Sequence, residues 1–147
     1  MSMQVKFWGV RGSIACSGPD TIRYGGNTPC VEVKCGDHTI IFDGGTGLRG
    51  LGNDVLARGA KMNADLFLSH CHFDHIGGIP FFTPLFQSGH KLRIWAGNLS
   101  PDYSLERTLR TMMSPPLFPV EVESFKASIA YGDFLPGCEF HPFEGAV

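Results

Sequence analysis

Six consecutive residues near the middle of the chain bring together several side chains that could bind a metal ion. The segment His70-Cys71-His72-Phe73-Asp74-His75 holds three of the six histidines in the chain beside a carboxylate. In an extended backbone, residues 70 and 72 point to the same side, so both imidazoles can reach one ion. Zinc–nitrogen bonds of about 2.0–2.1 Å require such convergence. Asp74 and His75 add donors for a second ion about 3.5–4 Å away.

A structural zinc site is the alternative to an open, hydrolytic one. Structural sites favour closed tetrahedra that are rich in cysteine. This cluster mixes histidine with aspartate, and the chain has no C-x-x-C pair. The sequence therefore predicts an open site with His70, His72, Asp74 and His75 as metal ligands. Asp74 is also the candidate catalytic residue, because its carboxylate can orient an attacking water.

Alternating apolar patterns predict the elements that position this cluster. A buried strand over residues 65–69 runs directly into His70, and Gly77-Gly78 lets the backbone turn away after the cluster. A long loop over residues 9–29 suggests function by its length alone. The remaining expected elements are strands over 5–8, 30–35, 38–42 and 91–96, weaker strands over 125–131 and 138–141, helices over 48–60 and 100–113, and a broken helix over 79–86. This pattern predicts an α+β fold and a single domain over residues 1–147.

Composition excludes several classes of partner. The net charge is −2 and no basic run is present, so nucleic acid is not an expected partner. The sequence has neither a signal peptide nor an apolar stretch of roughly 20 residues, so no membrane association is expected. The five cysteines are scattered and odd in number. They indicate a reducing, cytoplasmic setting.

A glycine-rich segment offers a competing hypothesis. Gly45-Thr-Gly-Leu-Arg-Gly50 fits G-x-G-x-x-G after an expected strand, the pattern of a loop that binds a nucleotide or a methyl donor. A Rossmann unit needs an acid at the far end of the next strand, whereas Asp65 stands at the start of that strand. The preceding hairpin, which turns at Gly36-Asp37, also argues against a βαβ unit. We therefore expect the glycines to shape the loop beside the metals.

The H-x-H-x-D-H segment resembles the hallmark of the metallo-β-lactamase superfamily. Residues 7–13, 24–30 and 42–47 are similar to a phosphodiesterase-like branch, which includes cyclic-nucleotide and cyclic-phosphate phosphodiesterases and, more distantly, transfer-RNA 3′ processing nucleases. The resemblance covers nearly the whole chain. It implies the amino-terminal part of a four-layer αββα sandwich. It also implies a hydrolase with two divalent ions, zinc first and manganese or iron as alternatives, that acts on a small phosphate ester.

Carried over position by position, the resemblance assigns the metal ligands. It implies that His70 and His72 bind one ion and that Asp74 and His75 bind the other. His141, which stands in a His-Pro-Phe-Glu-Gly stretch, is the candidate third ligand of the first ion.

The same resemblance implies two supporting roles. Asp43 matches an aspartate that braces the metal loop through hydrogen bonds and does not bind metal. Arg11, in a glycine-flanked loop, is the candidate contact for substrate phosphate. In the intact form, the ions would bring the pKa of a bridging water toward about 7, and the hydroxide would attack phosphorus in line.

The superfamily pattern continues with a bridging aspartate and a final histidine, and neither precedes Val147. We therefore expect a shortened chain with an incomplete second sheet, a weak second metal and impaired hydrolysis. A half sandwich leaves an apolar sheet face that soluble monomers rarely expose, so we expect a homo-oligomer that covers this face. The alternative function is a non-catalytic, metal-binding fragment that oligomerises through the same face.

Overall fold

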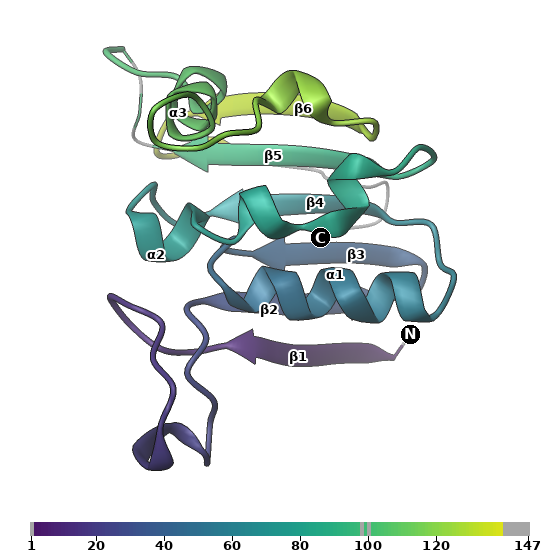
Figure 1. Ribbon diagram of the computed structural model, residues 1–147. Helices are drawn as coiled ribbons and strands as arrows, with labels where there is room; N and C mark the ends of the chain where they lie inside the picture. Colours follow the sequence, from purple (N-terminus) through teal and green to yellow (C-terminus); the bar gives the residue numbers. More distant parts are fainter. Residues whose placement is uncertain (1, 98, 100, 140–147) are drawn as a thin grey trace.

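The computed structural model describes residues 2–97, 99 and 101–139, and all of its strands belong to one sheet. In this sheet each strand lies beside its neighbour in sequence (Figure 1). The strands are β1 (Met3–Gly9), β2 (Cys30–Cys35), β3 (His38–Phe42), β4 (Asn63–Leu68), β5 (Lys91–Gly97) and β6 (Ser128–Phe134). The helices are α1 (Gly47–Ala57), α2 (Phe73–Ile76) and α3 (Leu105–Met112), with 3-10 turns η1 (Pro19–Thr21), η2 (Ile79–Phe81), η3 (Thr83–Phe86) and η4 (Val122–Ser124). The expected mixed α and β class is confirmed.

The strand directions bring the loops after β1, β3 and β4 to one edge of the sheet. β1, β2 and β3 are antiparallel, with the expected hairpin turn at Gly36-Asp37, whereas β3 to β6 are parallel. The carboxyl ends of β3, β4, β5 and β6 therefore meet at one edge, and β1 also ends there because it runs in the direction of β3. Figure 1 shows α2 at this edge, beyond the end of β4. Such edges are where open α/β sheets place their ligands.

The parallel arrangement of β3 and β4 corrects one expectation. The hairpin before β3 argued against a βαβ unit, yet β3, α1 and β4 form one, with Ile41 opposite Leu66 in the parallel pair. A hairpin and a crossover can share β3 because its two edges pair independently.

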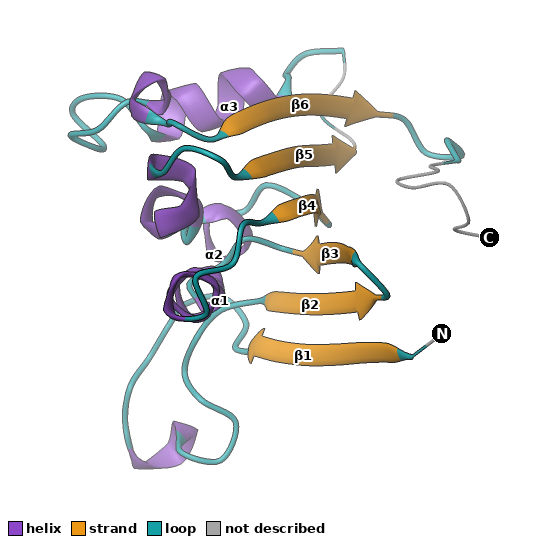
Figure 2. Cartoon of the chain, turned by 90° about the vertical axis from the view of Figure 1, so that its right-hand side faces the viewer, coloured by secondary structure: helices purple, strands orange, loops and turns teal. Residues whose placement is uncertain are grey.

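The helices α1, α2 and α3 all lie on the same face of the sheet (Figure 2). On that face Ile41, Leu66 and Ile94 stand in register across three strands and are fully buried. From α1, Leu48 and Leu51 are also fully buried and belong to the same core. Burial of these aliphatic side chains, at roughly 25 cal/mol per Å² of apolar surface, is the main force that holds the helices on the sheet.

Two helices are shorter than the sequence predicts. α1 ends at Ala57, three residues before the expected Ala60, and Gly59 then adopts a left-handed φ of 63°. α3 begins at Leu105 because Ser104 is its N-cap, with an extended backbone and a side chain that accepts a hydrogen bond from the Arg107 N–H. The broken helix expected over 79–86 is present as η2 and η3, which meet at Phe82.

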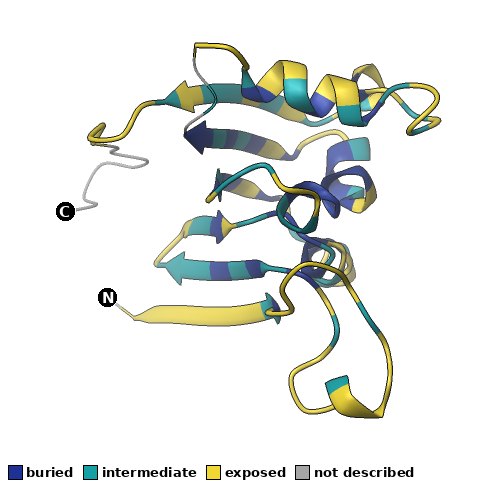
Figure 3. Ribbon diagram, turned by 90° about the vertical axis from the view of Figure 1, so that its left-hand side faces the viewer, coloured by how far each residue is buried: buried dark blue, intermediate teal, exposed yellow. Residues whose placement is uncertain are grey.

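The second face of the sheet carries no layer among the described residues. Figure 3 shows that β1 is exposed along most of its length. On this face Phe42, Phe67 and Trp95 stand in register, with ring centroids about 6 Å apart (6.2 and 6.1 Å). Phe42 is 47% exposed and Phe7 is 66% exposed. The described residues therefore form one sheet, covered on one face, and include no strand of a second sheet.

The two weaker strand predictions have different outcomes. The strand expected over 125–131 is β6, which begins at Ser128 and extends to Phe134. In the one expected over 138–141, Cys138 and Glu139 are not in a strand, and the remaining two residues lie outside the described part of the chain.

In the part that the structure describes, no helix has the length and apolar character needed to cross a bilayer.

Candidate metal centre

The histidine cluster forms a compact group of donors beyond the end of β4. One ligand atom from each of His70, Asp74 and His75 lies within 4.8 Å of the other two. The ring of His72 lies 4.5 Å from the ring of His70, centroid to centroid, and the ring of His75 lies 4.0 Å from it. The four predicted ligands therefore lie together. The tightest group joins His70 to Asp74 and His75, and the division of the ligands between two ions stays a prediction.

Asp43 supports this group of candidate ligands through contacts with Ser69 and His75. It follows β3 with a left-handed φ of 63°, a conformation that aspartate tolerates better than most residues. Its carboxylate accepts hydrogen bonds from the backbone N–H (2.8 Å) and the hydroxyl (2.9 Å) of Ser69. It also lies 3.0 Å from Nδ1 of His75. A carboxylate on Nδ1 fixes the ring and leaves Nε2 available to a metal, as expected of a bracing residue.

The loop after β1 contacts the cluster from the other side. Ser13 has a left-handed φ of 68° and donates its backbone N–H to Oδ2 of Asp74 at 2.9 Å. Partial desolvation of Asp74 acts to raise its pKa, but the Ser13 N–H and nearby His75 outweigh it, so the pKa is lowered. Asp74 is therefore a carboxylate at neutral pH. Arg11, two residues before Ser13, is exposed on this loop, and its predicted contact with substrate stays a prediction.

The donor set suits a divalent ion. Desolvation, followed by the charges of His75 and His72, lowers the pKa of His70. The neutral imidazole is the form that binds metal. Imidazole nitrogens beside a carboxylate, with no thiolate among them, form the type of site that zinc, manganese or iron occupies in open, catalytic centres.

The glycine-rich loop packs against this centre, and the structure argues against the nucleotide hypothesis. Gly44 donates its N–H to the carbonyl of His75 at 2.7 Å, and Gly78 donates to the carbonyl of Gly44 at 2.9 Å. A Cβ at Gly45 would overlap the carbonyl oxygen of Asp74. Internal acceptors also occupy the N–H groups of residues 45–48. A phosphate-binding loop needs these groups free, so the glycines instead allow close contact with the metal loop.

Sequence reasoning missed Ser69 and Ser13. The Ser69 hydroxyl lies 3.0 Å from Nδ1 of His70 and 3.3 Å from Nδ1 of His75, so it connects two candidate ligands to Asp43. Its position between a buried strand and the first histidine was a usable signal. Ser13 acts through its backbone, which no residue pattern reveals. His141, the remaining predicted ligand, lies outside the described residues.

The structure therefore combines an α+β sheet with a histidine–aspartate cluster that could hold a metal ion, beyond the carboxyl end of β4. A sequence model of the metallo-beta-lactamase superfamily matches residues 23–91, a range that contains all four candidate ligands. This match supports the resemblance to the metallo-beta-lactamase superfamily, whose members are metallo-hydrolases. No curated protein sequence matches the chain.

Solved structures share the fold. The chain is similar to the metallo-beta-lactamase fold protein YhfI from Bacillus subtilis, with a TM-score of 0.62 and 20% identity. It is also similar to human tRNase Z, short form (TM-score 0.57, 20% identity), and to a diphosphatase from the PhnP family (TM-score 0.55, 18% identity). The matches cover 97%, 90% and 90% of this chain, but 50%, 46% and 51% of the respective structures. The chain therefore spans about half the length of these neighbours.

Proposed function

We propose that the protein is a metal-dependent hydrolase that acts on phosphodiesters. The observation that carries the proposal is the convergence of His70, Asp74 and His75, whose ligand atoms lie within 4.8 Å of one another. The resemblance of residues 7–13 and 24–30 to the phosphodiesterase-like branch supports the substrate class. Two structural neighbours, a tRNase and a diphosphatase by name, also support it.

Different residues of the chain would have different roles at this site. A divalent ion, when bound, would lower the pKa of water toward about 7 and offset the charge that develops on phosphoryl oxygens. His70, His72, Asp74 and His75 would hold the ions. Asp74, kept ionised and fixed by the Ser13 N–H, would also orient the attacking water.

Two further residues act around the ligands. Asp43 would keep Nε2 of His75 directed at the ion through its contact with Nδ1. Arg11, on the same loop as Ser13, would contact a phosphate oxygen of the substrate. A reducing, cytoplasmic setting also belongs to the proposal, because all five cysteines of the chain are free.

Metal affinity tests the bracing role of Asp43. The purified chain is loaded with zinc, manganese or iron, and affinity is measured by competition with a chelator. We expect Asp43→Asn to reduce the affinity about 10- to 100-fold, the usual effect of removing a carboxylate that supports a ligand histidine. Asparagine tolerates the left-handed backbone, so the fold should persist. Asp37→Asn, in the exposed hairpin turn, is the matched control. Equal affinities for the two variants would contradict the bracing role.

A substrate panel tests the reaction. The metal-loaded protein is assayed with bis(4-nitrophenyl) phosphate, a thioester and a β-lactam. Because the second metal is expected to bind weakly, we expect slow hydrolysis overall, with the phosphodiester cleaved fastest at a rate that depends on metal, and we expect His70→Ala to abolish cleavage. His38→Ala, at the start of β3, is the control that should retain activity. Bound metal without hydrolysis of any substrate would instead support the non-catalytic alternative.

A further inference from the structure

The loop after β1 (residues 10–29) reaches the metal centre through its backbone. Most of this loop is exposed, and it extends away from the sheet (Figure 1 and Figure 3). Near its start, the N–H of Ser13 donates to Oδ2 of Asp74 at 2.9 Å. Exposed loops are mobile unless other contacts hold them. The contact with Asp74 therefore depends on whatever fixes the base of the loop.

Thr46 makes hydrogen bonds that are unusual for its position. It stands immediately before α1, where a threonine hydroxyl normally accepts a hydrogen bond from an N–H of its own helix. Here the side chain makes no such capping bond. Its hydroxyl oxygen instead accepts the backbone N–H of Thr28 at 2.9 Å, and its proton is donated to Oδ1 of Asn27 at 3.2 Å. The hydroxyl of Thr46 therefore bonds the loop and not the helix.

Thr28 forms a reciprocal pair with Thr46. Its hydroxyl accepts the backbone N–H of Thr46 at 2.7 Å and lies 3.4 Å from the Thr46 hydroxyl. Thr28 is 2% exposed, so water cannot replace these bonds if a hydroxyl is removed. A Cβ on Gly45 would overlap both Oγ1 of Thr28 and the carbonyl oxygen of Asp74. The threonine pair therefore lies close to the backbone of a candidate metal ligand.

Asn27 holds the base of the loop where it leaves β1. Its carbonyl accepts hydrogen bonds from the N–H groups of Val10 and Arg11, at 3.0 and 2.9 Å. Ser13 follows in the left-handed conformation (φ 68°), which a serine keeps only where its surroundings fix it. A chain of hydrogen bonds thus runs from Thr46 through Asn27 to the backbone that presents the Ser13 N–H.

We propose that Thr46 is a positioning residue of the metal centre. Through its bonds to Asn27 and Thr28, the Thr46 hydroxyl holds the base of the loop after β1. The Ser13 N–H therefore stays on the carboxylate of Asp74 and fixes its direction before an ion binds. Groups that orient a ligand in this way strengthen metal binding. The proposal rests on the metal centre of the proposed function, but it requires no hydrolysis.

Removal of the Thr46 hydroxyl at nearly constant size tests the proposal. Hydrogen exchange of the Ser13 amide is measured by NMR in the presence of a chelator, and zinc affinity is measured separately by competition. We expect Thr46→Val to speed this exchange about tenfold and to weaken zinc binding about tenfold. Thr46→Ser keeps the hydroxyl, so both values should stay close to those of the wild type.

A second variant removes the same contact from the other side. Asn27 is exposed, so Asn27→Ala deletes the acceptor of the Thr46 hydroxyl without disturbing the core. It should speed Ser13 exchange several-fold, but less than Thr46→Val, because the Thr28–Thr46 pair remains.

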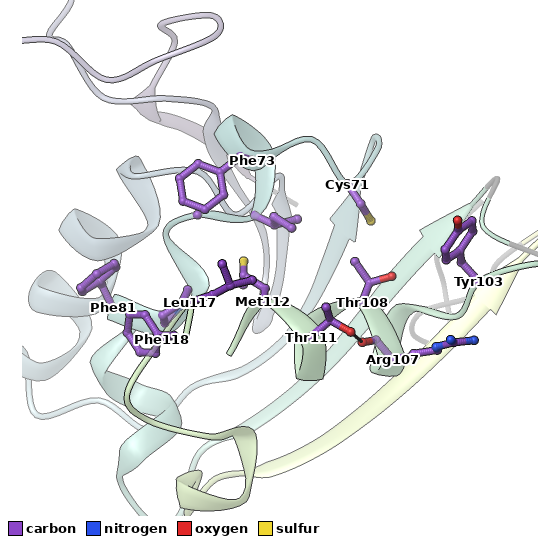
Figure 4. Close-up of a pocket in the computed structure, with 13 residues that line it drawn as sticks. Cys71, Phe73, Phe81, Tyr103, Arg107, Thr108, Thr111, Met112, Leu117 and Phe118 are labelled. Carbon is purple, nitrogen blue, oxygen red and sulfur yellow. Dashed lines mark hydrogen bonds between the residues drawn. The ribbon is translucent and has the colours of Figure 1, made fainter. Parts of the chain in front are cut away.

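Thr108→Val is the matched control. Thr108 is half-buried like Thr46, but its hydroxyl donates to the Ser104 carbonyl within its own helix. Figure 4 shows Thr108 on the wall of a cavity of about 790 Å³, which lies between residues 71–81 and α3 and which no residue of the loop after β1 lines. This variant should change neither readout.

Several results would overturn the proposal. Equal losses for Thr46→Val and Thr46→Ser would show that the packing of the methyl group matters and not the hydroxyl. Unchanged Ser13 exchange in Thr46→Val, with or without weaker zinc binding, would show that the loop is held without Thr46. A wild-type chain that binds no zinc would contradict the proposed function, whereas the exchange measurement, made without metal, would still decide whether Thr46 positions Ser13.

Discussion

The two faces of the sheet are formed by the same strands, but in the described part of the chain helices cover only one of them. On the covered face Ile41, Leu66 and Ile94 are fully buried beneath the helices. One residue further along each strand, Phe42, Phe67 and Trp95 form an equally apolar row that no described element covers. Apolar character therefore does not decide which face is covered. Crossovers between parallel strands are almost always right-handed, and this places all the helices on one side.

Neighbouring isoleucines of β3 provide the sharpest test of this difference, and the largest expected effect. Ile41 is fully buried on the covered face, whereas Ile40 is only partly buried on the open one. We expect Ile41→Ala to lower the free energy of unfolding by about 2–5 kcal/mol, because it leaves a cavity in a packed core. Ile40→Ala should cost only about 1 kcal/mol.

Urea denaturation of both variants measures the difference. The dependence of the unfolding free energy on urea should be unchanged, so that the midpoints report stability alone. Equal losses for the two variants would mean that the open face is covered in solution.

A second test asks whether another copy of the chain covers the open face, as the sequence predicts. Phe7 lies on this face of β1 and is 66% exposed. If two copies bury the face, Phe7→Glu should halve the mass measured by sedimentation equilibrium, because a desolvated carboxylate is costly. Ile22→Glu, at an 80% exposed position in the loop after β1, is the control. A wild-type monomer at all concentrations would refute the homo-oligomer.

A third and smaller effect concerns a polar group in the middle of the open face. Asp65 is 2% exposed and accepts hydrogen bonds from Nε and Nη2 of Arg93, both at 2.6 Å, and from the indole of Trp95 at 2.8 Å. The Arg93 side chain is 36% exposed, so water can replace part of what it loses. We therefore expect Asp65→Ala to cost about 1–3 kcal/mol.

Thermal or urea unfolding of Asp65→Ala measures this cost, and Asp65→Asn, which keeps the shape and part of the hydrogen bonding, should cost less. A loss above about 3 kcal/mol for the alanine variant would indicate a fully desolvated ion pair. The open face would then be buried by a partner, and the contrast between the two faces would disappear.

The sequence predicted those features that depend on residues close to one another in the chain. Apolar patterns located all six strands, and the candidate metal ligands could be named because they lie within six residues of one another. The contacts of Asp43 with Ser69 and His75 span more than 25 residues and depend on the pairing of β3 with β4. The cavity lined by residues between 71 and 81 and between 103 and 118 likewise joins segments that come together only after the sheet has formed. Spacing along the chain carries no signal for either.

The paired backbone hydrogen bonds between the glycine-rich loop and the metal loop have a dynamic consequence. Gly44 donates to His75, and Gly78 donates back to Gly44, so neither segment can open without breaking bonds of the other. Local opening of α2 would therefore expose the amide protons of both glycines together, as one cooperative unit of hydrogen exchange. Because the glycine-rich loop belongs to the crossover from β3 into α1, these hydrogen bonds would also limit the movement of the candidate ligands when no ion is bound.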